Sequence, residues 1–126
     1  MFRLSVILII IVSCNMQVYA TQSLKSSEVH LSDPFVHLLY SLEIAQLCGH
    51  NSDSVRQGYE LEKSRIINEL NLSKQATAEK SITASVLVDL EWQNLGLGGF
   101  KYWCAKEAAD AADYFVKIYN GFNKDE

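Results

Sequence analysis

Apolar residues recur every three or four positions along most of this chain, and this spacing places them on one face of an α-helix. Four such stripes follow one another between residues 34 and 119. Strand-like alternation is scarce, so the pattern predicts an all-α protein. The members are Leu38, Leu42, Ala45 and Cys48 in the first stripe, Val55, Tyr59, Ile66 and Leu70 in the second, Ala78, Ile82, Val86 and Leu90 in the third, and Cys104, Ala108, Ala111, Phe115 and Ile118 in the fourth.

Helix-starting and helix-stopping residues separate these stripes. The first helix is expected to begin at Pro34, whose missing N–H costs nothing in a first turn, and to end before Gly49. The glycine-rich segment LGLGG (95–99) is expected to end the third helix, and the fourth is expected from about Phe100 to Tyr119. Because the connections are short, we predict an up-down-up-down four-helix bundle. Its third helix, apolar on nearly every side, is expected to be the most buried.

The first twenty residues have the pattern of an export signal. Arg3 is their only charge, and the apolar run 4–12 is too short to span a membrane. Val18 and Ala20 suit a signal-peptidase cut after Ala20, which predicts a periplasmic or secreted protein. The alternative is lipidation of Cys14 in the segment IVSC, which would make the protein a membrane-attached lipoprotein.

Cleavage after Ala20 predicts a simple domain organisation: a signal peptide (1–20), a flexible lead-in (21–32), a helical domain (33–122) and a tail (123–126). The full chain has 15 acidic and 11 basic residues, and this balance argues against nucleic acid as a partner. After the signal, the sequence contains no apolar run long enough for a transmembrane span.

Cys48 and Cys104 are expected to form a disulfide, since either processing route takes Cys14 out of the pairing. In the predicted bundle Cys48 ends the first helix and Cys104 lies near the start of the fourth. These two points meet at the same end of an up-down-up-down bundle, within the reach that a disulfide needs.

The sequence contains none of the common catalytic, metal-binding or phosphate-binding motifs, so we expect no catalytic residues, no metal and no cofactor. Two functions other than simple binding are open. One is an envelope hydrolase that uses Asp89, Glu91 or His50 for acid–base chemistry. Asp89 suggests it, because a carboxylate within an apolar helix needs a partner or a role. The second is a periplasmic acid-stress chaperone, which the small size, helicity and disulfide would suit.

Aromatic residues gather around the glycine-rich segment, and such residues provide large contact areas at low entropic cost. This concentration predicts that an unknown protein partner binds there. The candidate partner-binding residues are Trp92, Gly98, Gly99, Phe100, Tyr102 and Trp103.

The segment DLEWQNLGLGGFKYWC, together with YSLEIAQLCG and GYELEKSRII upstream, resembles a group of small exported helical proteins from alphaproteobacteria with two mature cysteines. The resemblance implies a bacterial source and a location in the periplasm or beyond, and it carries no activity. We therefore expect an exported, non-enzymatic binding protein of the bacterial envelope.

Overall fold

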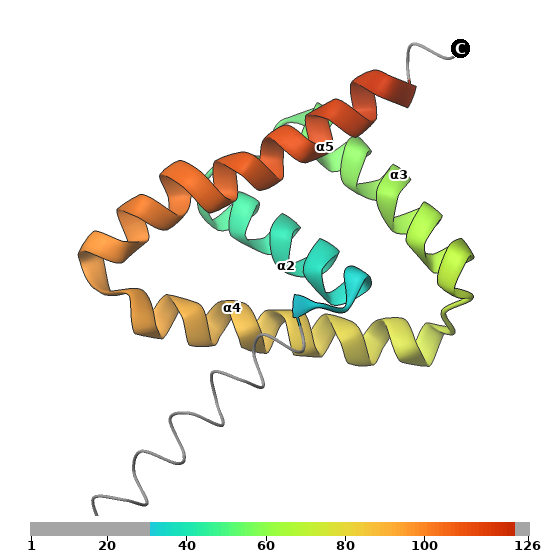
Figure 1. Ribbon diagram of the computed structural model, residues 1–126, viewed down its shortest axis with the longest axis horizontal. Coiled ribbons are helices and arrows are strands. Elements are labelled where there is room, and N and C mark those ends of the chain that lie inside the picture. The colour runs from blue at the N-terminus through green and yellow to red at the C-terminus, as the bar shows by residue number, and fades with distance from the viewer. Residues whose placement is uncertain (1–30, 123–126) are drawn as a thin grey trace, which may run out of the picture. The chain divides into compact units, whose positions relative to one another are not determined.

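The computed structural model describes residues 31–122, which are helical and contain no strand. The elements are α2 (Pro34–Leu47), α3 (Asp53–Leu70), α4 (Lys74–Trp103), the π-helix η1 (Cys104–Ala108) and α5 (Ala109–Phe122) (Figure 1). The predicted all-α class is confirmed. The expected signal peptide, Cys14, most of the lead-in and the tail lie outside the described residues.

Short polar side chains cap the starts of the helices. The Asp33 carboxylate accepts hydrogen bonds from the backbone N–H groups of Phe35 and Val36, both at 3.0 Å. Ser52 caps α3 and Ser73 caps α4 in the same manner. These contacts satisfy backbone donors that the first helical turn leaves unpaired, and they fix where each helix starts.

The predicted break between the third and fourth helices is confined to one residue. Gly96 has φ 60° and ψ −179°, which is not helical, and the chain is helical again immediately after it. The following helix therefore starts before the expected Phe100. The π-helix at Cys104–Ala108, with its wider turn, was not predicted.

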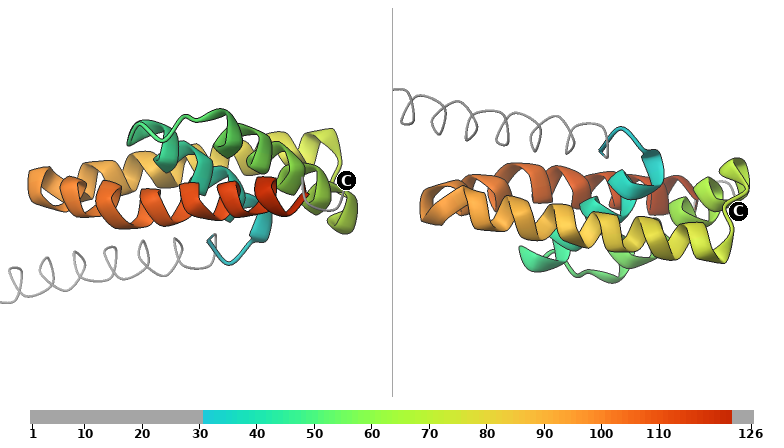
Figure 2. Two further views of the ribbon diagram at one scale, coloured as in Figure 1. Left: turned by 90° about the horizontal axis from the view of Figure 1, so that it is seen from above. Right: turned by 90° about the horizontal axis from the view of Figure 1, so that it is seen from below.

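Two long helical arms leave the Gly96 bend and form a V. One arm is α4 up to the bend, and the other is the last part of α4 (97–103) followed by η1 and α5 (Figure 1). Helix α2 lies between the arms and packs chiefly against α4, whereas α3 packs against α5. Both arms extend from the bend to the same side, so the chain runs toward the bend in one arm and away from it in the other (Figure 2). The closed up-down-up-down arrangement remains a prediction.

The hydrophobic core joins α2, α3 and α5. It contains Phe35, Leu38, Ala45, Val55, Tyr59, Ile66, Ala112 and Phe115. The Tyr59 and Phe115 rings meet edge to face, with centroids 5.8 Å apart. Gly58 lets the two helices approach closely, because a Cβ at this position would lie 1.9 Å from the Phe115 carbonyl oxygen.

Helix α4 packs through a different face from the one expected. The predicted stripe Ala78, Ile82, Val86 and Leu90 is exposed, and the side chains buried toward α2 are Ala84, Leu87 and Val88. The prediction that this helix is the most buried is therefore wrong. Since α4 is apolar nearly all round, its sequence does not specify which side packs.

The predicted disulfide is confirmed: Cys48 is bonded to Cys104, with the two Cα atoms 5.3 Å apart. It joins the residue after α2 to the first residue of η1. In the described part of the chain, no helix combines the length and apolar character that crossing a bilayer requires.

Candidate functional site

Three aromatic rings meet across the Gly96 bend. Trp92 precedes the bend, and Phe100 and Trp103 follow it. The Trp92 ring centroid lies 4.7 Å from that of Phe100 and 6.4 Å from that of Trp103. The bend thus brings together three of the four aromatic residues that the sequence singled out, while Tyr102 makes no such ring contact within residues 31–122.

These aromatic residues differ sharply in exposure. Trp92 is 47% exposed and Tyr102 is 63% exposed, whereas Trp103 is 1% exposed. Trp103 therefore belongs to the core. Contrary to the expectation from the sequence, its ring is not exposed to a surface partner. Gly98 is exposed with open space around it, and Gly99 packs against the Leu95 side chain.

We call Trp92, Gly98, Phe100 and Tyr102 the bend surface. The disulfide holds it in place, since Cys104 follows Trp103 directly and is bonded to the end of α2. The buried Trp103 ring anchors the same segment from within, although its indole N–H makes no hydrogen bond of good geometry within residues 31–122. The exposed aromatic residues thus project from a covalently fixed support.

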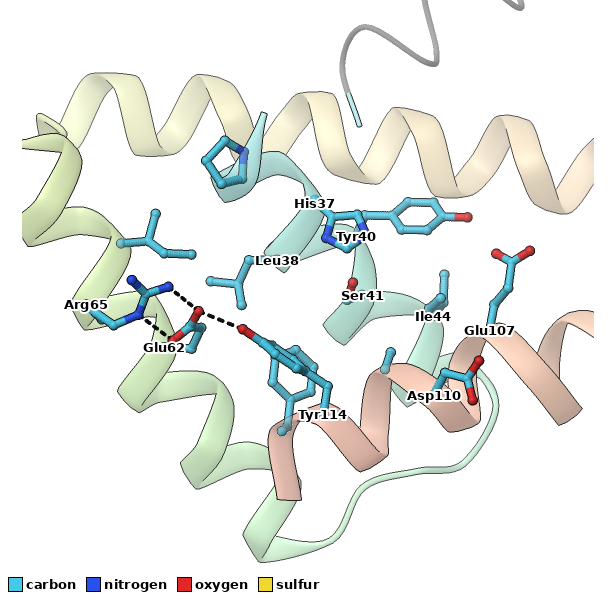
Figure 3. A pocket seen from close by; sticks show the side chains of 14 residues that line it. His37, Leu38, Tyr40, Ser41, Ile44, Glu62, Arg65, Glu107, Asp110 and Tyr114 are labelled. Carbon is cyan, nitrogen blue, oxygen red and sulfur yellow. Dashed lines mark hydrogen bonds and ion pairs between the residues drawn. The ribbon is translucent and has the colours of Figure 1, made fainter. Parts of the chain in front are cut away.

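A second region, which the sequence did not predict, is a cavity of about 580 Å³ between α2, α3 and the η1–α5 arm (Figure 3). Leu38, Ile44 and Phe115 contribute apolar walls. Polar groups come from all sides: His37, Tyr40, Ser41, Glu62, Arg65, Glu107, Asp110 and Tyr114. Burial raises the pKa of Tyr40 to about 12, so its hydroxyl stays protonated near neutral pH.

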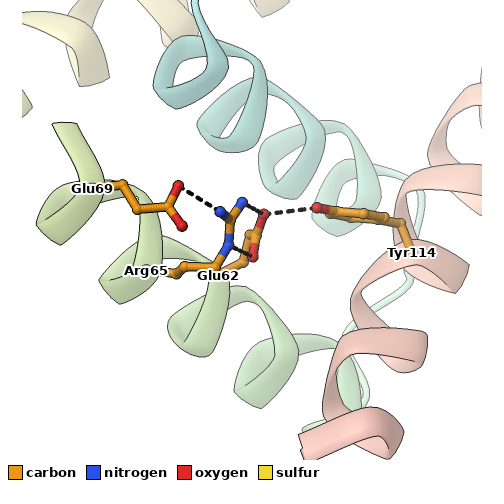
Figure 4. A network of polar contacts seen from close by, with 4 residues as sticks. All are labelled: Glu62, Arg65, Glu69 and Tyr114. Atoms are coloured by element: carbon orange, nitrogen blue, oxygen red, sulfur yellow. Dashed lines mark hydrogen bonds and ion pairs between the residues drawn. The ribbon is translucent and has the colours of Figure 1, made fainter.

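The buried carboxylate of Glu62 lines this cavity (Figure 3) and belongs to a network of polar contacts (Figure 4). Glu62 is 5% exposed and accepts hydrogen bonds from Arg65 Nε at 2.7 Å and from the Tyr114 hydroxyl at 2.8 Å. The hydrogen bond from Arg65 is the main cause that lowers the Glu62 pKa, and Tyr114 adds to it. Arg65 also donates to Glu69 at 2.6 Å. Glu62 therefore links α3 to α5, and the hydrogen bonds that it accepts stabilise its charged form.

One sequence signal could have indicated this network. Glu62 interrupts the apolar stripe of the second helix, and a charge on a buried face must be paired. Nothing in the sequence indicates that Tyr114, fifty-two residues further along, is its partner across the helices.

The residues of the hydrolase alternative do not converge on a cleft. Asp89 is exposed, Glu91 is half-buried on the same helix, and His50 lies in the turn after α2. None of the three lines the cavity of Figure 3 or a second one of about 520 Å³ beside α3. Within residues 31–122, no group of three histidine, cysteine or acidic residues is arranged to hold a metal ion.

Comparison of the chain with models of protein families, with curated proteins and with solved structures finds no match.

Proposed function

We propose that the protein is an exported, non-enzymatic binding protein of the bacterial envelope that engages a protein partner through the bend surface. The observation that carries this proposal is the exposure of Trp92 and Tyr102 on a segment fixed by the Cys48–Cys104 disulfide. Large aromatic side chains on a rigid support lose little entropy on binding, which is why such residues dominate many protein interfaces.

The four aromatic candidates for partner binding differ in exposure and therefore in the role proposed for them. Trp92 and Tyr102 are the exposed groups, Phe100 contacts the Trp92 ring edge to face, and Trp103 is buried beneath the surface. Truncation of Trp103 would therefore report on folding as much as on binding. A test of the surface must use the exposed pair.

Export is supported by the N-terminal sequence pattern together with the disulfide, because structural disulfides persist in oxidising compartments. Lipidation at Cys14 would add a membrane tether to the same binding protein. The short connections 48–52 and 71–73 favour antiparallel neighbours, so the up-down-up-down order remains part of the proposal.

The test compares the bend variant W92A/Y102A with L70A in affinity capture from envelope extracts of the source organism. Leu70 is a matched control, since it is as exposed as Trp92 but lies at the end of α3. We expect wild type and L70A to recover the same partner and the bend variant to lose it. Equal recovery by all three, with circular dichroism showing folded proteins, would contradict the proposal.

The acid-stress chaperone is the second candidate function, and the exposed apolar stripe of α4 favours it. An ion pair between Asp33 and Lys80 holds the start of α2 to α4. Burial alone would raise the Asp33 pKa, but the hydrogen bonds from Lys80 and Val36 lower it overall. Acid would protonate this carboxylate and loosen α4, exposing more apolar surface. Binding of a hydrophobic dye that stays flat down to about pH 3 would remove this candidate.

A further inference from the structure

Three large apolar side chains form an exposed row on α4. Ile82 is 67% exposed, Val86 50% and Leu90 41%. Their spacing of four residues places them on one side of the helix, close to the polar residues Glu79 and Gln93. We call these five residues the outward face of α4.

No described element covers the outward face. Before the Gly96 bend, the buried apolar residues of α4 are Ala84, Leu87 and Val88, and they lie on the side of the helix opposite to Val86, where α4 packs against α2. A contiguous apolar row rimmed by polar residues is typical of an interaction surface.

We infer that the outward face binds a second copy of this chain, with the two α4 helices antiparallel and a two-fold axis passing near Val86. The face is self-complementary in this register. Ile82 and Leu90 lie four residues before and four after Val86, so each meets the other across the axis. The Val86 side chains of the two copies then meet each other, which is the isologous contact that two-fold symmetry requires.

The charge pattern selects the antiparallel register over the parallel one. Glu79 and Gln93 lie seven residues to either side of Val86, so the Glu79 carboxylate faces the Gln93 amide of the second copy and can accept its N–H. A parallel pairing would instead set Glu79 against Glu79, and like charges at a helix interface are destabilising.

A dimer of this kind would also arrange the bend surfaces. Val86 is ten residues from Gly96, so the two bends lie on the order of 30 Å apart at opposite ends of the helix pair, at 1.5 Å per residue. The dimer could then engage a repeated or dimeric partner at two points. The dimer itself does not depend on the proposed function.

The first test is sedimentation equilibrium of the full chain, purified with its own N-terminus, over a range of concentrations. V86E is compared with L70E, since Val86 and Leu70 are about equally exposed. We expect a concentration-dependent dimer for wild type and L70E, and for V86E a dissociation constant at least about tenfold higher, because a charge is brought to the dry centre of the interface. A monomeric wild type, or equal weakening by L70E, would overturn the inference.

The second test fixes the register by cysteine cross-linking under mild oxidation. V86C should cross-link to itself, and a mixture of I82C and L90C should cross-link to each other. I82C alone should not, since its two copies would lie about 12 Å apart along the axis, beyond the reach of about 7 Å between Cα atoms. Self-linking of I82C as fast as that of V86C would overturn the antiparallel register. W92A/Y102A should leave both results unchanged, so failure of the bend surface and failure of the dimer are distinguishable.

Discussion

The sequences of α3, α5 and α4 have similar apolar patterns, but the α3–α5 interface is enclosed whereas α4 keeps an apolar row exposed. At the α3–α5 interface the backbones approach closely at Gly58, a buried carboxylate is paired across the helices, and Phe115 is fully enclosed. Helix α4 packs one side against α2 and leaves an apolar row exposed on the other. The contrast shows that apolar periodicity marks a surface that needs covering, and does not say whether this chain or another molecule covers it.

The largest expected difference in stability is between a substitution at the α3–α5 interface and one in the exposed row of α4. F115A removes a fully enclosed ring and should lower the free energy of unfolding by about 4 kcal/mol. I82A removes a side chain of the exposed row and should change the free energy of the monomer by less than about 0.5 kcal/mol. Urea titration at low protein concentration measures both. Similar losses would mean that the outward face is part of the core.

Removal of the disulfide tests how the bend is held. C48S/C104S removes the disulfide between cysteines that are 56 positions apart. This should lower the free energy of unfolding by about 4 kcal/mol or somewhat less. Amide hydrogen exchange should rise most in residues 97–108, while the α3–α5 interface keeps its relative protection. Uniform loss of protection along all helices would contradict a local role.

Two glycines sharpen the comparison further. G58A places a Cβ against the Phe115 carbonyl and should destabilise the protein by about 2–3 kcal/mol, since the backbones must separate. G98A meets open space in a helical segment and should be neutral or stabilising by up to about 1 kcal/mol. Thermal unfolding of both variants checks this, and a tolerated G58A would show that the helices are not in close contact.

The smallest effect concerns the paired carboxylate and depends on pH. The Glu62 pKa lies below its ordinary value of 4.5, so its contribution is complete above that value and is lost as the pH falls through the lower folded-state pKa. E62Q should therefore cost about 1–2 kcal/mol at pH 7, and this cost should shrink as the pH falls below about 4.5. Because Glu69 is exposed, E69Q should cost less than about 0.5 kcal/mol. If the difference in free energy of unfolding between wild type and E62Q does not shrink in acid, the pairing of Glu62 with Arg65 and Tyr114 is contradicted.

Local chemistry allowed much of the fold to be predicted. Pro34 and Gly49 mark the limits of α2 because the interactions that start or stop a helix lie within a few residues. The disulfide was predicted because only two cysteines remained and the helix order placed them together. The close approach at Gly58 and the Glu62–Tyr114 contact were missed because each depends on a partner more than fifty residues away.

The sequence predicted where the candidate site lies, but not which of its side chains are exposed. The glycine-rich segment indicated a bend with aromatic residues around it, and the structure has this bend at Gly96. Which side chains face outward depends on the helix phase after Gly96, and the sequence does not define that phase. For this reason Tyr102 and Trp103, adjacent in sequence, could not be separated into an exposed residue and a buried one.

The most direct measurement of the central claim is photo-cross-linking in the source organism, with p-benzoylphenylalanine replacing Tyr102 in one strain and Leu70 in another. Both positions are exposed, but only Tyr102 belongs to the bend surface. We predict a discrete covalent adduct with one partner protein from position 102 and none from position 70. No adduct at position 102, or the same adducts from both positions, would contradict the account.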